Sequence, residues 1–457
     1  MRFLTCVFIG LVCFTGCVPE KDTDKTPQST KIKATQKSST GKKCDTVTIF
    51  LSGDTLSQLK PCGCAAGQLG GFSQRQVIFD QVDAKTRLLI DTGNFLIDNT
   101  PQDMVKLNTI ISSLITLDYD VVNFNEDDLS AVTEGYTIEQ IPFKVIGPNE
   151  KLESVFRRNI TTGTSIAAVT VASVSSQAIE DGSFGKGDLE KLFTNDTVSV
   201  ANSTAINILI IDTFNESIAD FIAGSKVVNI AVCGYDSDDP SVIKTEHQSP
   251  VFVSVGKLGK YVGRLDLTLS DKKGIELLFS GIAVDENLPP SQQLDEIYQA
   301  YREMVRAEDL LGKVIRTPLP NGHKYAGSDK CKDCHEYAHK MWSKMPHANA
   351  YQTLVDSGDA YDPECIECHV VGLKYDSGFE NENSPKELRN VGCEVCHGPR
   401  SKHIKNAMDN TENKKKSEPV ATFMCISCHT TEHSPGFQAD ETGYRKKTLH
   451  KMEQKSK

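Results

Sequence analysis

Short apolar runs separated by polar, glycine-containing stretches dominate the chain between residues 45 and 285. Each run has the length of a buried β-strand rather than of a helix. Their ends carry Gly, Asp and Asn, which favour loops at the edge of a sheet, where binding and catalytic sites are common. The pattern predicts a layered α/β domain. The predicted strands are Thr46–Leu51, Arg87–Asp91, Val121–Phe124, Ile166–Val174, Ile206–Ile211, Val227–Val232, Val251–Val255 and Val262–Leu269.

The pattern changes after Leu288-Pro289-Pro290. Apolar side chains then recur at helical spacing from Ser291 to Leu311, which predicts an amphipathic connector helix that docks two domains. From Asn321 onward, few residues are available to enclose each of the cofactors described below. We therefore expect sparse helices and loops wrapped around them. The predicted order is an α/β domain over residues 45–285, a connector over 286–320 and a small, mostly α domain over 321–457.

The first 44 residues indicate an export signal and a tether. The apolar run Phe3–Phe14, followed by Thr15-Gly16-Cys17, resembles a bacterial lipoprotein signal over residues 1–17 and predicts lipid attachment at Cys17. A plain signal peptide or a short anchor is the alternative. Residues 18–44 contain almost nothing apolar, which predicts a disordered tether. We expect an exported protein held at a membrane, in the periplasm or at the cell surface, and Val18 favours the outer membrane.

The chain has 457 residues and a formal net charge of -11. This length exceeds what one hydrophobic core usually supports and predicts two or three domains. The acidic balance argues against binding to nucleic acid. It leaves small molecules and electron-transfer proteins as partners.

Four Cys-x-x-Cys-His motifs occupy the last third of the chain. On one helical turn, positions i, i+3 and i+4 share a face, so two thiols can bond a porphyrin while the imidazole reaches its iron. Zinc knuckles are the alternative, but zinc does not require the His that follows each pair here. We therefore predict four covalently bound c-type haems. They would be attached through Cys331, Cys334, Cys365, Cys368, Cys393, Cys396, Cys425 and Cys428, with His335, His369, His397 and His429 as proximal iron ligands.

Further histidines in the same segment are candidates for the opposite, distal position on iron. His339 lies four residues after His335 on the same face of a helix, so it cannot cap that iron from the other side. His323 is a further candidate. The distal candidates that we carry forward are His347, His403, His433 and His450.

Several stretches around these motifs resemble the tetrahaem cytochrome c-554 family. They are Tyr325–His335, Trp342 with Pro346-His347-Ala348, Cys365–Gly372, and Val391–Pro399 followed by His403. The resemblance covers nearly the whole C-terminal domain and implies an electron-transfer protein, with His347 and His403 as the best distal ligands. In this family one haem is typically five-coordinate. A haem with two His ligands passes electrons, whereas an open iron can bind NO, nitrite or hydroxylamine.

The α/β domain resembles the metallophosphoesterase domain of 5′-nucleotidases and UDP-sugar hydrolases, at Asp54, Gly70–Arg75, Leu89–Asn94, Tyr119–Asp127 and Val251–Leu267. That family binds two metals through Asp, Asn and several His residues. Here the positions of those ligands hold Leu56, Asn94, Asn125-Glu126-Asp127, Asp212 and Gly234-Tyr235-Asp236, and His247 is the only histidine of the domain. We therefore expect no phosphatase activity. Asp54, Asp91 and Glu126 could still hold Mg²⁺ or Ca²⁺, or they are solvated loop carboxylates.

The loop after the first predicted strand carries Lys60-Pro61-Cys62-Gly63-Cys64. A disulfide between residues i and i+2 closes a small ring and is easily reduced, so Cys62 and Cys64 are a candidate redox pair. Lys60 could lower a thiol pKa there. The motif resembles a subgroup of nucleotidase-like exported proteins with P-C-G-C, some of which carry selenocysteine. Structural disulfides to Cys44 or Cys233 are the alternative.

Three functions follow as hypotheses. The first is an electron-transfer protein whose haems exchange electrons between a redox partner protein and the Cys62/Cys64 pair. The second is a multihaem reductase of a small nitrogen compound at an open haem. The third is a working phosphoesterase fused to a cytochrome.

Overall fold

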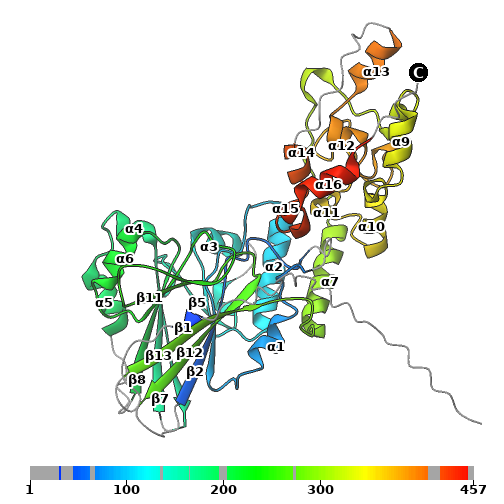
Figure 1. The fold of residues 1–457 in the computed structure, drawn as a ribbon. Coiled ribbons are helices and arrows are strands. Elements are labelled where there is room, and N and C mark those ends of the chain that lie inside the picture. Colours follow the sequence, from blue (N-terminus) through cyan, green and yellow to red (C-terminus); the bar gives the residue numbers. More distant parts are fainter. Residues whose placement is uncertain are drawn as a thin grey trace, which may run out of the picture.

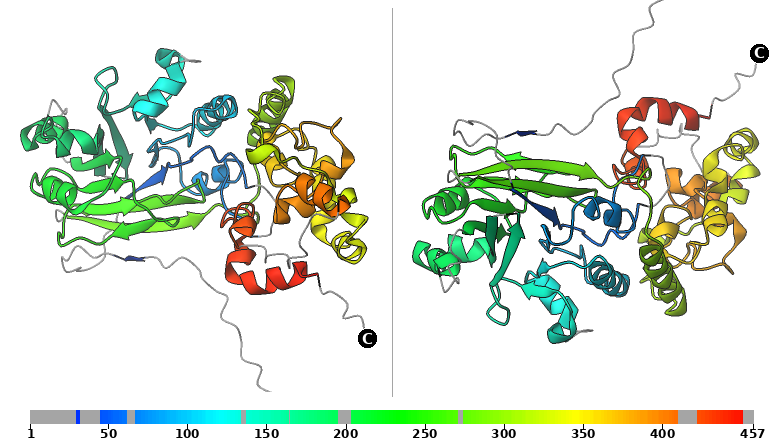
Figure 2. Two further views of the ribbon diagram at one scale, coloured as in Figure 1. Left: turned by 90° about the horizontal axis from the view of Figure 1, so that it is seen from above. Right: turned by 90° about the horizontal axis from the view of Figure 1, so that it is seen from below.

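The structure, a computed structural model, describes residues 30–31, 45–61, 67–133, 137–163, 165–194, 203–270, 274–409 and 422–450. Figure 1 shows an α/β domain with two sheets, a connector helix beside it and a C-terminal domain of short helices. The two further views in Figure 2 show the C-terminal domain at one end of the α/β domain rather than over its sheets.

One sheet has, within the described residues, the strand order β1-β13-β12-β2-β3-β4-β5. The strands β2, β3, β4 and β5 are parallel neighbours, whereas β12 and β13 form an antiparallel hairpin against β2. The parallel strands end at one edge, so the loops that follow them lie together. The bounds are β1 Thr30–Lys31, β2 Asp45–Ser52, β3 Arg87–Asp91, β4 Val121–Asn123, β5 Lys144–Ile146, β12 Tyr261–Ser270 and β13 Gly274–Ala283.

The other sheet has the order β10-β11-β9-β8-β7-β6. Its centre is parallel, from β7 through β8 and β9 to β11, and each edge strand is antiparallel to its neighbour. The bounds are β6 Val155–Thr162, β7 Ser165–Val174, β8 Ser203–Ile211, β9 Ile230–Cys233, β10 Ser241–Ile243 and β11 Val251–Ser254.

The two sheets pack face to face, and helices cover their outer faces. In β2, Val47, Ile49 and Leu51 enter the core between the sheets, while Phe50 enters the core under the helices. This alternation follows from the period of two in a strand. The first sheet is covered by α1 Arg75–Phe79, α2 Pro101–Thr116, α3 Glu126–Thr133 and α7 Gln292–Ala307, and the second by α4 Ser176–Glu180, α5 Lys186–Thr194 and α6 Glu216–Ala223.

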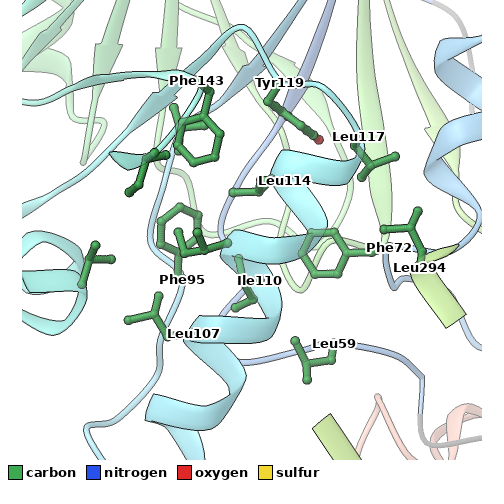
Figure 3. Close-up of a cluster of buried hydrophobic side chains, with 14 of the residues drawn as sticks. Leu59, Phe72, Phe95, Leu107, Ile110, Leu114, Leu117, Tyr119, Phe143 and Leu294 are labelled. Atoms are coloured by element: carbon green, nitrogen blue, oxygen red, sulfur yellow. The ribbon is translucent and has the colours of Figure 1, made fainter. Parts of the chain in front are cut away.

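Helix α2 is the centre of the outer core on the first sheet. Figure 3 shows Leu107, Ile110 and Leu114 of α2 among apolar side chains from several other segments. Thr100 caps the helix in a reciprocal capping box with Asp103, and Pro101 starts it. Helix α7 packs along α2, and Leu294 and Tyr301 of α7 belong to the same core. The connector is therefore part of the α/β domain's packing, which joins that domain to the chain that follows.

The C-terminal domain has a small apolar core and many short helices. The bounds are α8 Ser328–Lys332, α9 Glu336–Trp342, α10 Ala350–Ser357, α11 Pro363–Glu367, α12 Cys393–His397, α13 Ser401–Met408, α14 Thr422–Ile426, α15 Pro435–Ala439 and α16 Glu441–Thr448. Short 3-10 turns cover Ile138–Gln140, Pro320–Gly322, Pro346–Asn349 and Lys386–Leu388. The predicted fold class, a layered α/β domain followed by a small, mostly α domain, is confirmed.

Each of the eight predicted strands overlaps an observed one, and α7 matches the predicted connector helix. The strands β5, β6, β10 and β13 were not predicted, because they are short or have only brief apolar runs interrupted by polar residues and glycine. A two-residue strand, Thr30–Lys31, pairs with β13 inside the segment predicted to be a disordered tether. Cys17 and the rest of the predicted signal lie outside the described residues. Within the described residues, no helix combines the length and the apolar character needed to cross a membrane.

Candidate functional site

The C-terminal domain brings three pairs of histidine rings together. The ring centres are 6.2 Å apart for His335 and His403, 6.1 Å for His347 and His429, and 6.4 Å for His397 and His450. Each pair joins one predicted proximal histidine to one predicted distal candidate. The pairing therefore couples residues that are far apart in the chain.

These separations leave room for an iron between the rings. Imidazole nitrogens bind a metal at about 2 Å, so the two rings of each pair would hold an iron between them. The cysteines of the four motifs are all free thiols. The residues present therefore fit c-type haem, with thiols for covalent attachment and imidazoles for the iron.

His369, the motif histidine that follows Cys368, has a different environment. Its Nδ1 lies 2.6 Å from the carbonyl oxygen of Ala350, which orients the ring. The Thr353 hydroxyl lies 3.5 Å from the same nitrogen. Within the described part of the chain, no ring contact joins His369 to a second histidine.

The other distal candidates are placed apart from the motif histidines. His433 is exposed, and its Nδ1 lies 3.0 Å from the Thr430 hydroxyl. The structure gives it no ring contact with a motif histidine in the described segments. His339 packs against Trp342, with ring centres 5.2 Å apart. The distal role of His433 therefore gains no support from the geometry.

The motifs are also close to one another. The Cys331 thiol is hydrogen-bonded with the Cys393 thiol, and the Cys428 thiol with the Cys368 thiol. Burial raises the pKa of the Cys396 thiol, and the nearby Cys425 raises it further. The first motif therefore adjoins the third, the third adjoins the fourth, and the fourth adjoins the second.

Glu394, inside the third motif, ties this motif to the first and was not singled out from the sequence. The side chain is 2% exposed. Its carboxylate accepts backbone hydrogen bonds from Ala326 at 2.9 Å, Gly327 at 2.8 Å and Arg400 at 2.8 Å. A buried carboxylate with three N–H donors is well satisfied. It holds the loop before the first motif against the third motif.

A second group of polar side chains lies at the edge of the α/β domain where β2, β3 and β4 end. The Ser52 hydroxyl donates to Asp91 Oδ2 at 2.6 Å, and its oxygen lies 2.7 Å from the Tyr119 hydroxyl. Asn94 Nδ2 donates to Asp54 Oδ1 at 2.7 Å. Burial raises the pKa of both Asp54 and Asp91. Asp54 and Asn94 also have φ angles of 46° and 62°, in the left-handed region, so this edge carries backbone strain.

Arg75 supplies a positive charge to this group. The side chain is 0% exposed, and its Nε donates to the Gly71 carbonyl at 3.1 Å. The guanidinium carbon lies 4.2 Å from the centre of the Phe72 ring. Its charge lowers the pKa of Asp91 and of Tyr119, against the larger effect of burial, which raises both. In the sequence, Arg75 is only the end of a glycine-rich turn, so its burial could not be foreseen.

The predicted residual metal trio is not assembled. Glu126 is exposed at the start of α3, whereas Asp91 is buried and already bonded to Ser52. Among the residues that the structure describes, no group of three or more His, Cys, Asp or Glu side chains is arranged to hold a metal ion. The buried guanidinium of Arg75 is near enough to lower the pKa of Asp91.

The candidate redox pair, Cys62 and Cys64, lies outside the described residues, as does Cys44. Cys233, one of their suggested disulfide partners, is a free thiol at the end of β9. Burial, together with the charge of Asp212, raises the pKa of Cys233 to about 12. A thiol of this kind is unreactive near neutral pH. The suggested disulfide to Cys233 is therefore not present.

Asp128 should make the stability of the α/β domain depend on pH. Burial raises the pKa of Asp128 to about 7, although hydrogen bonds from the backbone N–H groups of Phe95, Asn94 and Asn125 lower it. Between about pH 4 and pH 7 the native state therefore binds more protons than the unfolded chain, and the free energy of unfolding falls as pH rises through this window. Denaturant unfolding at several pH values should show this fall in the wild type and a flatter profile in Asp128→Asn.

The exposed neighbour Asp127 provides the control for this measurement. Asp127→Asn should keep the wild-type pH profile. Parallel profiles for Asp128→Asn and the wild type would contradict the prediction.

Comparisons with known proteins find one sequence family and a set of solved structures that are similar to parts of this chain. Residues 330–398 match the family model described as cytochrome c554 and c-prime. Cytochrome c-554 of Nitrosomonas europaea is 30% identical in an alignment of 112 positions that covers 20% of this chain and 48% of that protein. The chain thus spans about half the length of this curated relative.

Similar solved structures are phosphoesterases. The calcineurin-like phosphoesterase YfkN from Bacillus subtilis has 14% identity and a TM-score of 0.43, covering 57% of this chain and 98% of that one. The 5′-nucleotidase precursor from Thermus thermophilus has 16% identity and a TM-score of 0.42, covering 68% of each chain.

The four motifs, their free thiols and the paired imidazoles all lie in the C-terminal domain, where the sequence match is found. This domain is similar to cytochrome c554, and its free thiols and paired imidazoles fit covalently attached haem.

Proposed function

We infer that the protein is an exported electron-transfer protein with four c-type haems, held at a membrane by a lipid on Cys17. The haems take electrons from, or pass them to, a redox partner protein. The terminal redox group is the Cys62/Cys64 pair of the α/β domain. The observation that carries the electron-transfer role is the set of three histidine ring pairs with centres 6.1 to 6.4 Å apart. Iron with two imidazole ligands has no free position for a substrate, so it exchanges electrons.

The contacts between motifs support a continuous path. They order the motifs as first, third, fourth and second, with thiols of neighbouring motifs in contact or close by. Haems attached at neighbouring motifs are brought together by these contacts. The chain's own residues supply attachment, axial ligands and orientation, and the haem supplies the one-electron chemistry.

The described residues on both sides of the Cys62/Cys64 loop support its place at the end of this path. Gln68 Nε2 donates to the backbone carbonyl of Glu432 at 2.6 Å, three residues after His429. Lys60 Nζ lies 5.2 Å from the centre of the Tyr298 ring on the connector helix. Tyr298 in turn lies near Cys365. Burial raises the pKa of Tyr298, and the charge of Cys365 raises it further. Lys60 and Gln68 thus lie near segments that carry the second and fourth motifs.

The proposed redox step involves two electrons and two protons. Reduction of a disulfide between Cys62 and Cys64 breaks the sulfur–sulfur bond and takes up both electrons and both protons. The partner protein supplies the electrons through the haem chain, and solvent supplies the protons. The reverse step returns two electrons to the partner and releases two protons.

Coulometric titration of the purified protein tests this proposal. The wild type should take up two electrons more per chain than Cys62→Ser. Mass spectrometry after alkylation should find Cys62 and Cys64 modified only in the reduced sample. Cys233→Ser is the matched control, because Cys233 is a free, buried thiol and its loss should not change the electron count. Equal counts for the wild type and Cys62→Ser would contradict the proposal.

A second function, reduction of a small nitrogen compound, is favoured by one observation. His369 is oriented by Ala350 and has, in the described part of the chain, no ring contact with a second histidine. A haem attached at this motif would keep one side of its iron open for a ligand such as NO. Phosphatase chemistry is not proposed, because the domain has a single histidine and its described residues hold no group of three or more His, Cys, Asp or Glu side chains arranged for a metal ion.

A further inference from the structure

The helix that carries the second motif is held by residues of the α/β domain. Helix α11 starts after Asp362, whose side chain accepts from the backbone N–H of Glu364 at 3.0 Å and caps the helix. Gln102, near the start of α2, donates its Nε2 to Asp362 Oδ1 at 2.8 Å. The Tyr301 hydroxyl on α7 lies 2.9 Å from the same Nε2 and donates to Asp362 Oδ2 at 3.3 Å. The capping residue is therefore fixed from two helices of the other domain.

An ion pair joins the same two helices. Lys106 Nζ on α2 lies 2.5 and 2.6 Å from the two carboxylate oxygens of Glu364. The Lys106 side chain is only 7% exposed, whereas that of Glu364 is 55% exposed. A buried ammonium is costly unless it is paired, so the geometry of this pair is strongly constrained.

Glu364 is next to Cys365, and α11 is short. The segment Pro363–Glu367 is followed at once by Cys368 and His369, so a shift of α11 moves both thiols and the motif histidine. The segment before α11 is held as well, because Arg302 on α7 contacts Asp359 at 2.8 Å and donates to the Ser357 carbonyl at 2.6 Å. In Figure 1, α2, α7 and α11 meet where the two domains join.

We propose that Gln102, Lys106 and Tyr301 are positioning residues for the haem of the second motif, so that the α/β domain sets the reduction potential of that haem. This inference rests on the proposed haem attachment at Cys365 and Cys368. The three residues act through Asp362 and Glu364, which orient the attachment helix. Outer contacts of this kind tune a haem by fixing its ligands and the charge around it.

The direction of the effect follows from charge. In the wild type, Lys106 neutralises the Glu364 carboxylate next to Cys365. Without Lys106, an uncompensated negative charge remains near the haem and disfavours the uptake of an electron. The reduction potential of this haem should therefore fall, while the other haems keep theirs.

Spectroelectrochemical titration of the full-length Lys106→Met variant tests the inference. At the potential where the wild-type haem of the second motif is half reduced, the ratio of reduced to oxidised haem should drop on the order of tenfold. The His369→Ala variant identifies the transition of this haem, because it is the transition that this substitution alters. Lys106→Arg keeps the charge and should restore the wild-type value. Gln102→Leu removes the hydrogen bonds of Gln102 to Asp362 and Tyr301 without changing any charge, and it should alter the visible spectrum of this haem alone.

Lys144→Met is the matched control. Lys144 forms an ion pair with Glu153 at the same distance, 2.5 Å, but its side chain is 37% exposed and lies on β5, far from the motif in the chain. All haem transitions should stay unchanged in this variant.

The pyridine haemochrome assay verifies that each variant carries the same haem content. With full haem content, a Lys106→Met titration that superimposes on the wild type, or an equal shift of all haems, would overturn the inference. Neither result depends on the electron count at Cys62 and Cys64.

Discussion

Low-temperature EPR of the oxidised protein is expected to show one high-spin ferric haem beside three low-spin haems, and NO is expected to bind the reduced protein at the second motif alone. Two imidazole ligands produce a low-spin iron, and three motif histidines have a second ring 6.1 to 6.4 Å away. His369 has its contacts with Ala350 and Thr353 instead. The coordination of each haem is thus predicted from the ring geometry.

Single substitutions test two of the three pairs. His403→Ala should convert the haem of the first motif to high spin, and His450→Ala should do the same for the third. His433→Ala is the control, because His433 is exposed and hydrogen-bonded to Thr430. An unchanged spectrum for His403→Ala would contradict the pairing, and so would a new high-spin signal for His433→Ala.

The wild-type spectrum also separates the two candidate functions. Four low-spin haems that do not bind NO would leave the Cys62/Cys64 pair as the candidate site for a chemical reaction. A high-spin haem that binds NO would move the search for a substrate to nitrogen oxides and hydroxylamine. Since a ligand site can coexist with electron transfer, the coulometric titration remains necessary in either case.

Replacement of Arg75 by Met should lower the free energy of unfolding of the α/β domain by about 1 to 3 kcal/mol, because Asp91 loses a buried positive charge that favours its ionised form. Arg75 and Asp91 are both 0% exposed, and the charge of Arg75 lowers the pKa of Asp91. Without the guanidinium, the carboxylate keeps its desolvation cost and loses its compensating charge. Denaturant unfolding followed by circular dichroism in the far ultraviolet should show the α/β domain unfolding at lower denaturant.

Two variants control for this effect. Arg75→Met combined with Asp91→Asn should recover part of the loss, because the buried negative charge is gone as well. Arg157→Met removes an exposed arginine that bonds only the Leu192 carbonyl, and it should change stability little. A loss in Arg157→Met as large as that in Arg75→Met would show that the buried charge is not the cause. The haem absorption spectrum reports whether the C-terminal domain stays folded.

Local patterns predicted the strands whose residues are apolar over several positions. They did not predict β13, whose apolar residues are interrupted by Glu276, Ser280 and Gly281, and which is defined by its pairing with β12. They gave no sign of the two-residue strand β1 either, because its sequence is polar. Pairing between strands depends on partners that are distant in the chain, and a local window does not contain them.

Haem attachment follows from the chain alone, because two thiols and an imidazole within five residues share one face of a helical turn. The amphipathic connector helix and the scarcity of histidine in the α/β domain can be recognised in the same way. Three-dimensional packing was needed to show which histidines face each other, that Arg75 is buried beside Asp91, and that Lys106 meets Glu364, 258 positions along the chain. These contacts join segments whose spacing has no period. Their geometry comes from the packing of whole helices and sheets and not from the local chain.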